Sequence, residues 1–156
     1  MSKTSRILPA GLALVCAGLL LTPAGCRKGF DATAPVGFAA FAGGRQFRAV
    51  SSDGVSYRVR QESNDPQADL AFWREALKKR MIDAGYAFVA DSEIKAGAVA
   101  GYLLELAAPV GAQDYSYTVA IFVSGKHVTI AESAGEVTRF RAHRQDVLAA
   151  IGRLQL

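Results

Sequence analysis

Four consecutive segments after Gly85 show the two-residue alternation of β-strands, and they constrain the fold more than any other part of the chain. The segments are residues 86–93, 99–108, 113–124 and 126–133. The connections between them are short, as between antiparallel neighbours, whereas parallel strands need long crossovers. In the third segment, Val119 and Ile121 lie on one face and Ala120 and Phe122 on the other. We therefore predict an antiparallel sheet in which the third segment is an inner strand.

Shorter strands are predicted before this region. Residues 36–44 and 46–50 are two short runs with strand-forming residues, and apolar and polar side chains alternate in 55–60. Asp53 and Gly54 stand between the second and third runs, and an Asp-Gly pair is a strong hairpin signal. The hairpin around this pair is therefore expected to join the sheet.

A long middle helix is predicted to begin at Asp65 and Pro66, since Asp is a favoured N-cap and Pro suits the first helical position. Apolar residues then recur at the three- and four-residue spacing of a helix face. They are Leu70, Trp73, Leu77, Met81 and Ala84. Gly85 suits the left-handed residue that ends many helices. Four basic residues are expected to form a solvated face of this helix, with a patch for an anionic partner as the alternative. They are Arg74, Lys78, Lys79 and Arg80.

A second helix is predicted near the C-terminus. Residues 134–136 interrupt the strand pattern, and apolar residues from Phe140 to Leu154 then follow a helical stripe. Gly152 is expected to weaken the last turn.

The order of these elements resembles the PsbP-like family, which includes small bacterial lipoproteins. The stretches 53–59 (Asp-Gly-Val-Ser-Tyr-Arg-Val) and 114–117 (Asp-Tyr-Ser-Tyr) carry the resemblance, which covers most of residues 36–154. It implies an α+β fold in which an antiparallel sheet of about six strands is packed by the middle and C-terminal helices as an α/β/α sandwich. It also implies a binding or assembly module and no enzyme chemistry.

The N-terminus has the layout of a secretory signal peptide. Lys3 and Arg6 precede an almost continuous apolar run over 7–21, and the small residues Ala24 and Gly25 follow. The run is shorter than the roughly 20 residues that a membrane-spanning helix needs. We therefore predict that residues 1–25 are a cleaved signal.

Cys26 follows Ala24-Gly25, and this stretch resembles a bacterial lipobox, with Pro23 standing where an aliphatic residue is usual. The resemblance implies a covalent diacylglyceryl lipid on Cys26, and two acyl chains give stable membrane attachment. Ordinary secretion after a cut near Gly25, or lipidation of Cys16, are the alternatives. Residues 26–35 would then be the lipidated cysteine and a tether, and 36–156 a single domain.

This anchor places the predicted domain at a bacterial membrane, facing the periplasm. Arg27 follows the cysteine, which by resemblance to enterobacterial sorting favours the outer membrane. Removing residues 1–25 takes two of the 18 basic residues and none of the 14 acidic ones. The remaining charge of +2 gives no nucleic-acid footprint, so no nucleic-acid partner is expected.

Residues 27–156 offer few groups for catalysis. Cys16 and Cys26 are the two cysteines of the chain, so the predicted domain has no disulfide and no thiol nucleophile. His127 and His143 are not arranged as a zinc-binding motif, and no metal site is predicted. Ser124 stands near His127 but outside any GxSxG or SxxK motif. We therefore predict no catalytic residues, no enzyme activity and no cofactor beyond the covalent lipid.

The densest local charge lies at the start of the C-terminal helix and comprises Arg139, Arg141, His143 and Arg144. It is interpreted as a solvated flank paired with Glu136 and Asp146, or as a docking patch for an acidic partner or an anionic headgroup. Five carboxylates are expected on the polar faces of strands and turns. They are Asp91, Glu93, Glu105, Glu132 and Glu136. Four tyrosines are expected in the core with their hydroxyls at its edge, or around a groove. They are Tyr86, Tyr102, Tyr115 and Tyr117.

Together these features predict a lipid-anchored protein of the bacterial cell envelope that acts by binding, as an accessory or assembly module. Its expected partners are the membrane, through the lipid anchor, and another envelope protein. The alternatives are a small-molecule carrier with a groove between sheet and long helix, and a small envelope hydrolase.

Overall fold

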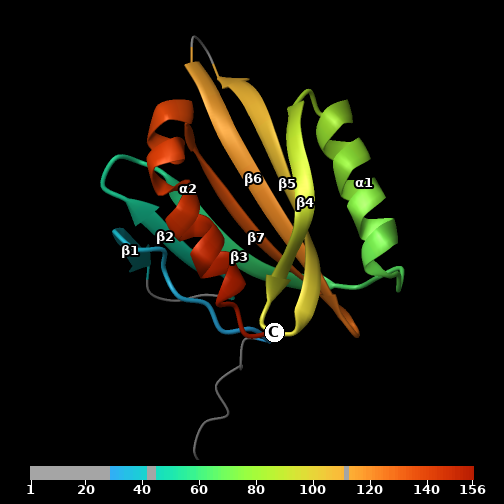
Figure 1. The fold of residues 1–156 in the computed structure, drawn as a ribbon. Helices are drawn as coiled ribbons and strands as arrows, with labels where there is room; N and C mark the ends of the chain where they lie inside the picture. The colour runs from blue at the N-terminus through green and yellow to red at the C-terminus, as the bar shows by residue number, and fades with distance from the viewer. Residues whose placement is uncertain (1–28, 42–44, 111–112) are drawn as a thin grey trace, which may run out of the picture.

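The computed structural model describes residues 29–41, 45–110 and 113–156, and these form an α+β fold (Figure 1). The strands are β1 (Phe38–Phe41), β2 (Phe47–Ser51), β3 (Ser56–Ser63), β4 (Ala87–Ala96), β5 (Val99–Val110), β6 (Gln113–Ser124) and β7 (His127–Glu136). The helices are α1 (Leu70–Asp83), between β3 and β4, and α2 (Val137–Gly152), after β7.

The strands form one antiparallel sheet in the order β1-β2-β3-β7-β6-β5-β4. The sheet has seven strands, so the predicted count of about six is too low. β6 pairs with β7 and β5, which confirms the prediction that residues 113–124 form an inner strand. The hairpin at Asp53-Gly54 is also confirmed, since β2 pairs with β3 and Gly54 has a φ of +92°.

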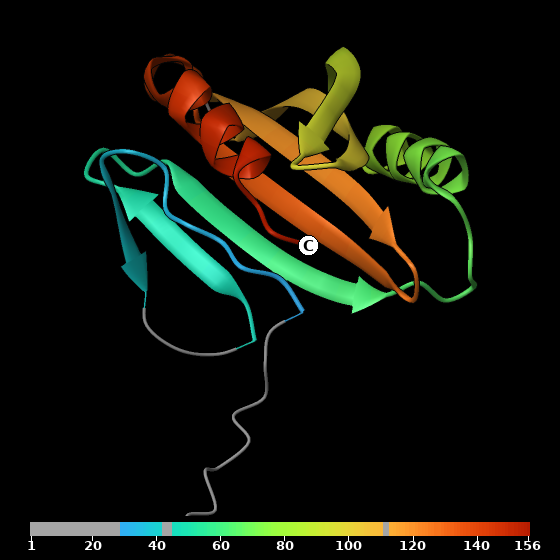
Figure 2. The same ribbon diagram turned by 60° about the horizontal axis from the view of Figure 1, so that its bottom comes forward.

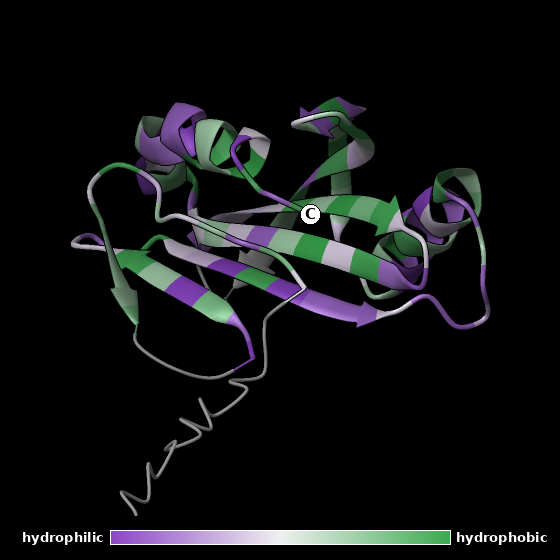
Figure 3. Ribbon diagram, turned by 90° about the horizontal axis from the view of Figure 1, so that it is seen from below, coloured by the Kyte–Doolittle hydropathy of each residue, from purple (hydrophilic) through white to green (hydrophobic). Residues whose placement is uncertain are grey.

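The two helices cover opposite faces of the sheet, which gives the predicted α/β/α arrangement. On β5, Leu103 packs in one cluster with Val147 and Ile151 of α2. The next residue, Leu104, belongs to a second cluster, to which α1 contributes its apolar residues. Successive side chains of a strand point to opposite faces, and Figure 3 shows the resulting alternation of polar and apolar residues along the strands.

α1 begins at Leu70, four residues after the predicted position of its first turn. Asp69, and not Asp65, is the N-cap, and its Oδ1 accepts a hydrogen bond from the Phe72 backbone N–H at 2.9 Å. Asn64 holds the preceding loop, because its Oδ1 accepts a hydrogen bond from the Ala68 backbone N–H at 3.1 Å. The backbone of 64–68 is thus engaged by a side chain and does not join the helix.

The C-terminal end of α1 is as predicted. Gly85 has a φ of +91°, and its backbone N–H donates to the Ile82 carbonyl at 2.9 Å. The N–H of Tyr86 donates to the Met81 carbonyl at 3.1 Å. These two bonds form a Schellman motif, which satisfies carbonyls of the last turn.

β7 continues through residues 134–136, so the prediction that these residues end the sheet and that the helix starts at Phe140 is wrong. The Val55 side chain approaches this part of β7 so closely that a Cβ on residue 135 would lie 2.8 Å from it. Gly135 therefore suits this position of the strand. Glu136 caps α2: its carboxylate accepts hydrogen bonds from the backbone N–H groups of Thr138 and Arg139 at 2.9 and 3.2 Å. The helix therefore begins at Val137.

Residues 29–31 lie against the end of the chain. Phe30 is buried in the α2-side cluster beside Leu154. Asp31 and Gln155 exchange backbone hydrogen bonds of 2.9 and 3.1 Å as an isolated antiparallel bridge. In the described part of the chain, no helix is long and apolar enough to span a membrane. The predicted signal and Cys26 lie outside the described residues.

Candidate functional site

The two helices bury their apolar residues to different extents. α2 contributes Phe140, Val147, Ala150 and Ile151 as fully buried residues. α1 has no buried residue, although Leu70, Trp73, Leu77 and Met81 pack against the sheet. α1 also lies on the opposite side of the molecule from β1 and β2 (Figures 1 and 2). The sheet residues directly beneath α1, such as Val119 and Ile121, are buried, whereas the apolar side chains of α1 stay half-buried.

A cleft of about 540 Å³ lies between α1 and strands β3, β7 and β6. Eight apolar side chains line it: Trp73, Ala76, Leu77 and Met81 from α1, and Val119, Ile121, Val128 and Ile130 from the sheet. Its polar lining includes Arg60, Glu62 and Ser63 of β3, Arg80 of α1, and Tyr117 and Glu132. This volume and this mixture are typical of small-molecule sites, which are mostly apolar with a few polar groups.

A second hollow of about 330 Å³ lies on the same face, over β1, β2, β3 and β7. Phe41, Arg48, Val50 and Arg58 are among its lining residues. Tyr117 and Glu132 line this hollow and also the cleft under α1, so the two hollows meet at these side chains.

Glu132 forms the polar centre between the hollows. Its residue is only 7% exposed, and its Oε1 accepts a hydrogen bond from the Tyr117 hydroxyl at 2.7 Å. Its Oε2 accepts one from Arg58 Nε at 2.7 Å, and Arg60 Nη2 lies 3.4 Å from Oε1. Arg58 stands directly opposite Glu132 in the pairing of β3 with β7.

These contacts keep Glu132 ionised. Burial alone would raise the pKa of its carboxyl, but the hydrogen bonds from Tyr117, Arg60 and Arg58 outweigh burial and lower it. The pKa of Tyr117 is raised, first by burial and then by its hydrogen bond to the carboxylate. Tyr117 therefore stays a neutral donor, and Glu132 a charged acceptor, at neutral pH.

Arg80 differs from the arginines on β3. Arg60 pairs with Glu62 at 2.6 Å and with Glu132 at 3.4 Å, and Arg58 pairs with Glu132. On α1, Lys79 pairs with Asp83 at 2.6 Å. In the described residues, Arg80 makes no ion pair, and its side chain lines the cleft. The cleft therefore contains one positive charge without a protein counter-ion.

Polar contacts attach the first turn and the middle of α1 to the rest of the protein. Near its N-terminus, the Trp73 indole N–H donates to Asn64 Oδ1 at 2.7 Å, and Asn64 Nδ2 donates to the Gly125 carbonyl at 3.0 Å. Further along, Asp91 of β4 accepts hydrogen bonds from Lys78 at 3.1 Å and from the Tyr102 hydroxyl at 2.8 Å.

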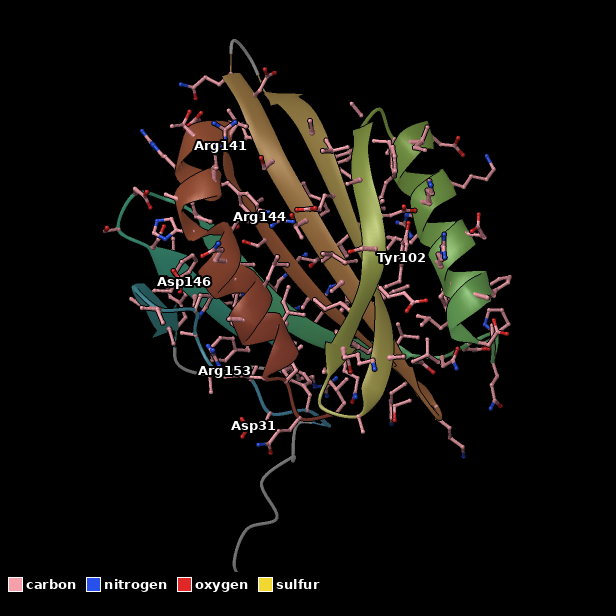
Figure 4. The ribbon with its side chains drawn as sticks, in the orientation of Figure 1. Asp31, Tyr102, Arg141, Arg144, Asp146 and Arg153 are labelled. Carbon is pink, nitrogen blue, oxygen red and sulfur yellow. The ribbon has the colours of Figure 1, made fainter. Side chains whose placement is uncertain are left out.

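The Arg74 guanidinium lies 5.0 Å from the centre of the Tyr102 ring, which is labelled in Figure 4. The Tyr102 hydroxyl, followed by Lys78, lowers the pKa of Asp91. Asp91 is therefore ionised at neutral pH and can pair with the cations of α1. These contacts hold the helix above the cleft.

The predicted patch on α2 is divided between two sets of partners. Arg139 Nη1 donates to the Asp53 carbonyl at 3.0 Å, and His143 Nε2 lies 3.0 Å from Asp53 Oδ1. Arg144 makes a two-pronged bond to Glu105, with distances of 2.7 and 2.9 Å. Arg141 is exposed.

Arg141, Arg144 and Asp146 all lie on α2 in Figure 4. In the described residues, the ion-pair partners of the patch are Asp53 and Glu105, and not the predicted Glu136 and Asp146. Docking at this patch remains a prediction.

Ser124 and His127 face each other across the turn at Gly125, and both are exposed. No hydrogen bond joins their side chains within the described part of the chain. The described residues also contain no group of three His, Cys, Asp or Glu side chains that could hold a metal ion.

Sequence reasoning named Glu132 and Tyr117 as separate candidates but did not bring Arg58 and Arg60 to them. The available signal was the alternation in β3, which places Arg58 and Arg60 on one face. The sequence pattern does not show the register in which β3 pairs with β7, and this register places Arg58 opposite Glu132, 74 positions later.

A scan against protein-family models and a search of curated proteins gave no match to this chain. Among solved structures, LpqN of Mycobacterium tuberculosis, described as involved in cell envelope biogenesis, has a TM-score of 0.66 at 8% identity. The match covers 81% of this chain and 82% of LpqN. Protein PA94 of Pseudomonas aeruginosa, of unknown function, has a TM-score of 0.62 at 13% identity, covering 93% and 94%.

Cyanobacterial PsbP from Synechocystis sp. PCC 6803 has a TM-score of 0.58 at 10% identity, covering 83% of this chain and 87% of that one. The chain therefore has a PsbP-like fold, as the resemblance implied. At these identities the likeness concerns the fold alone.

Proposed function

We propose that this protein is a lipid-anchored accessory protein of the bacterial cell envelope, and that it binds another envelope component in the cleft under α1. It acts by binding and not by catalysis. The anchor is Cys26, and the lipid holds the domain at the membrane.

The observation that carries this proposal is the incomplete packing of α1. A helix normally gains its stability by burying an apolar face, yet Trp73, Leu77 and Met81 remain half-buried above a cleft of about 540 Å³. A bound component would cover this apolar surface and gain the free energy of its removal from water. α2, by contrast, buries four residues against the sheet.

Two further facts support the placement in the envelope. The Ala24-Gly25-Cys26 stretch resembles a lipobox, and it follows a segment with the layout of a signal peptide. LpqN, which shares the fold, is described as involved in cell envelope biogenesis.

Site-specific crosslinking in living bacteria tests the binding site. A photoreactive amino acid is placed at Ala76, which lines the cleft and is exposed, or at Ala71, which is also exposed on α1 but does not line it. We expect a discrete adduct from position 76 and none from position 71. Equal adducts from both positions, or none from either, would contradict a binding site in the cleft.

The intact mass of the membrane-extracted protein tests the anchor separately. The native protein is expected to start at Cys26 and to carry acyl mass, and a Cys26→Ala variant is expected to lack it. An unmodified, soluble native protein would refute the anchor without bearing on the cleft.

A further inference from the structure

We propose that the component held in the cleft is a single-chain amphiphile with an anionic head, its chain along the apolar walls and its head at Arg80. This inference rests on the proposed function and names the chemical class of its ligand.

The apolar part of the cleft fits one hydrocarbon chain. Its eight apolar side chains come from both walls, four from α1 and four from the sheet. Val119, Ile121 and Val128 are buried at the sheet wall, whereas the α1 wall is only half covered. A chain between these walls would complete the contacts that α1 lacks, and its apolar surface would be removed from water.

The charges of the cleft favour an anionic head. Among the charged residues of the lining, Arg60 pairs with Glu62 and Glu132, and Glu132 pairs also with Arg58 of the neighbouring hollow. Arg80 is the remaining cation of the lining, and a guanidinium binds a carboxylate or phosphate through two parallel hydrogen bonds. A neutral ligand would not pair with the Arg80 guanidinium, and a cationic ligand would be repelled by it.

The dimensions disfavour a helix of a partner protein. A helix with its side chains is about 10 Å across, so it would enter only if α1 moved away from the sheet. Contacts of Trp73 with Asn64 and of Lys78 with Asp91 hold the first turn and the middle of α1 in place. A volume of about 540 Å³ lies within the range of sites for small ligands.

Trp73 is the one tryptophan of the chain and lines the cleft, so its fluorescence reports directly on occupancy. The experiment uses the full chain with Cys26→Ser, so that no covalent acyl group competes with the probe. A stearate brominated in mid-chain is titrated below its critical micelle concentration, and its methyl ester serves as the uncharged probe.

We expect saturable quenching of Trp73 by the brominated acid, with about fivefold weaker binding of the ester, the scale of one exposed ion pair. Arg80→Gln should remove this difference between acid and ester. Lys79→Gln, a neighbouring cation that pairs with Asp83, should preserve it. Ala76→Phe should obstruct the cleft and weaken binding at least tenfold, whereas Ala71→Phe should not.

Far-UV circular dichroism and urea midpoints verify that each variant is folded before its binding is interpreted. Equal binding of acid and ester, unaffected by Arg80→Gln, would overturn the anionic head. Absence of quenching, or quenching that Ala76→Phe leaves unchanged, would overturn the amphiphile. If an apolar helical peptide bound in the Ala76-sensitive manner instead, the cleft would belong to a protein partner. If any of these results overturned the anionic amphiphile, a discrete crosslink from position 76 in cells would still support binding in the cleft. The ligand class and the proposed function can therefore be refuted separately.

Discussion

Replacement of Glu132 by glutamine tests the polar centre of the site most directly. Gln keeps the shape of the side chain but removes the charge that Arg58 and Arg60 share. Breaking a buried ion pair costs about 3–5 kcal/mol. Here the arginine side chains are 43% and 24% exposed, so water can solvate part of their charge. We therefore expect Glu132→Gln to lower the free energy of unfolding by about 2–3 kcal/mol at pH 7.

The effect should depend on pH in a defined direction. The pKa of Glu132 is lowered in the folded protein. Its contribution to stability is therefore fully present above its unfolded pKa of about 4.3 and is lost as the pH falls through the lower, folded value. The stability difference between wild type and Glu132→Gln should thus be constant near neutrality and shrink in acid.

Urea unfolding at several pH values measures this difference, with Trp73 fluorescence and circular dichroism as the two signals. With a denaturant slope of about 1–3 kcal/mol/M, the midpoint at pH 7 should fall by about 1–2 M. Glu62→Gln is the matched control: its side chain is 55% exposed and pairs with Arg60 alone, so a loss below about 0.5 kcal/mol is expected. A loss at pH 7 no larger than this control, or a gap that widens in acid, would refute the reasoning.

Three further substitutions probe the packing of α1, of the sheet on its α2 side, and of α2. Asn64→Ala should lower the free energy of unfolding by about 1–3 kcal/mol, because it leaves the Trp73 indole N–H without its acceptor. The emission maximum of Trp73 should shift at the same time, and an unchanged maximum would count against the contact. Gly101→Ala should cost about 1–3 kcal/mol in urea unfolding, since a Cβ there would meet the Phe122 ring and lie 2.7 Å from the Ile121 carbonyl. Gly152→Ala should be neutral or stabilise α2 by up to about 1 kcal/mol, because the nearest atom to an added Cβ, the Lys95 carbonyl oxygen, lies 3.7 Å away. A clear loss of stability would contradict this spacing.

The sheet could be predicted because its signals are local. Alternation along a strand depends on neighbouring residues, and Gly54 and Gly125 mark turns where the backbone adopts a positive φ. The end of α1 at Gly85 is local in the same sense. The short run 36–44 carries little alternation of its own, but it was identified as a strand and contains β1 (Phe38–Phe41).

The features that sequence reasoning missed depend on distant partners. α1 starts late because Asn64 binds Ala68 and also the Gly125 carbonyl, 61 positions away. The cluster around Glu132 requires the pairing of β3 with β7, which no periodicity within either strand determines. A groove between the sheet and the long helix was among the alternatives in the sequence analysis, but its size depends on how completely α1 is buried, which an apolar stripe on a helix does not reveal.

The bridge between Asp31 and Gln155 limits how far the domain can move from a lipid on Cys26. Phe30, which is buried in the same cluster as Leu154, lies four positions after the cysteine. Four residues span at most about 14 Å, compared with roughly 30 Å if 27–35 were a free tether. The domain of an acylated protein would then stay close to the bilayer that holds its lipid. Delivery to an opposing membrane would first require Phe30 to leave the core.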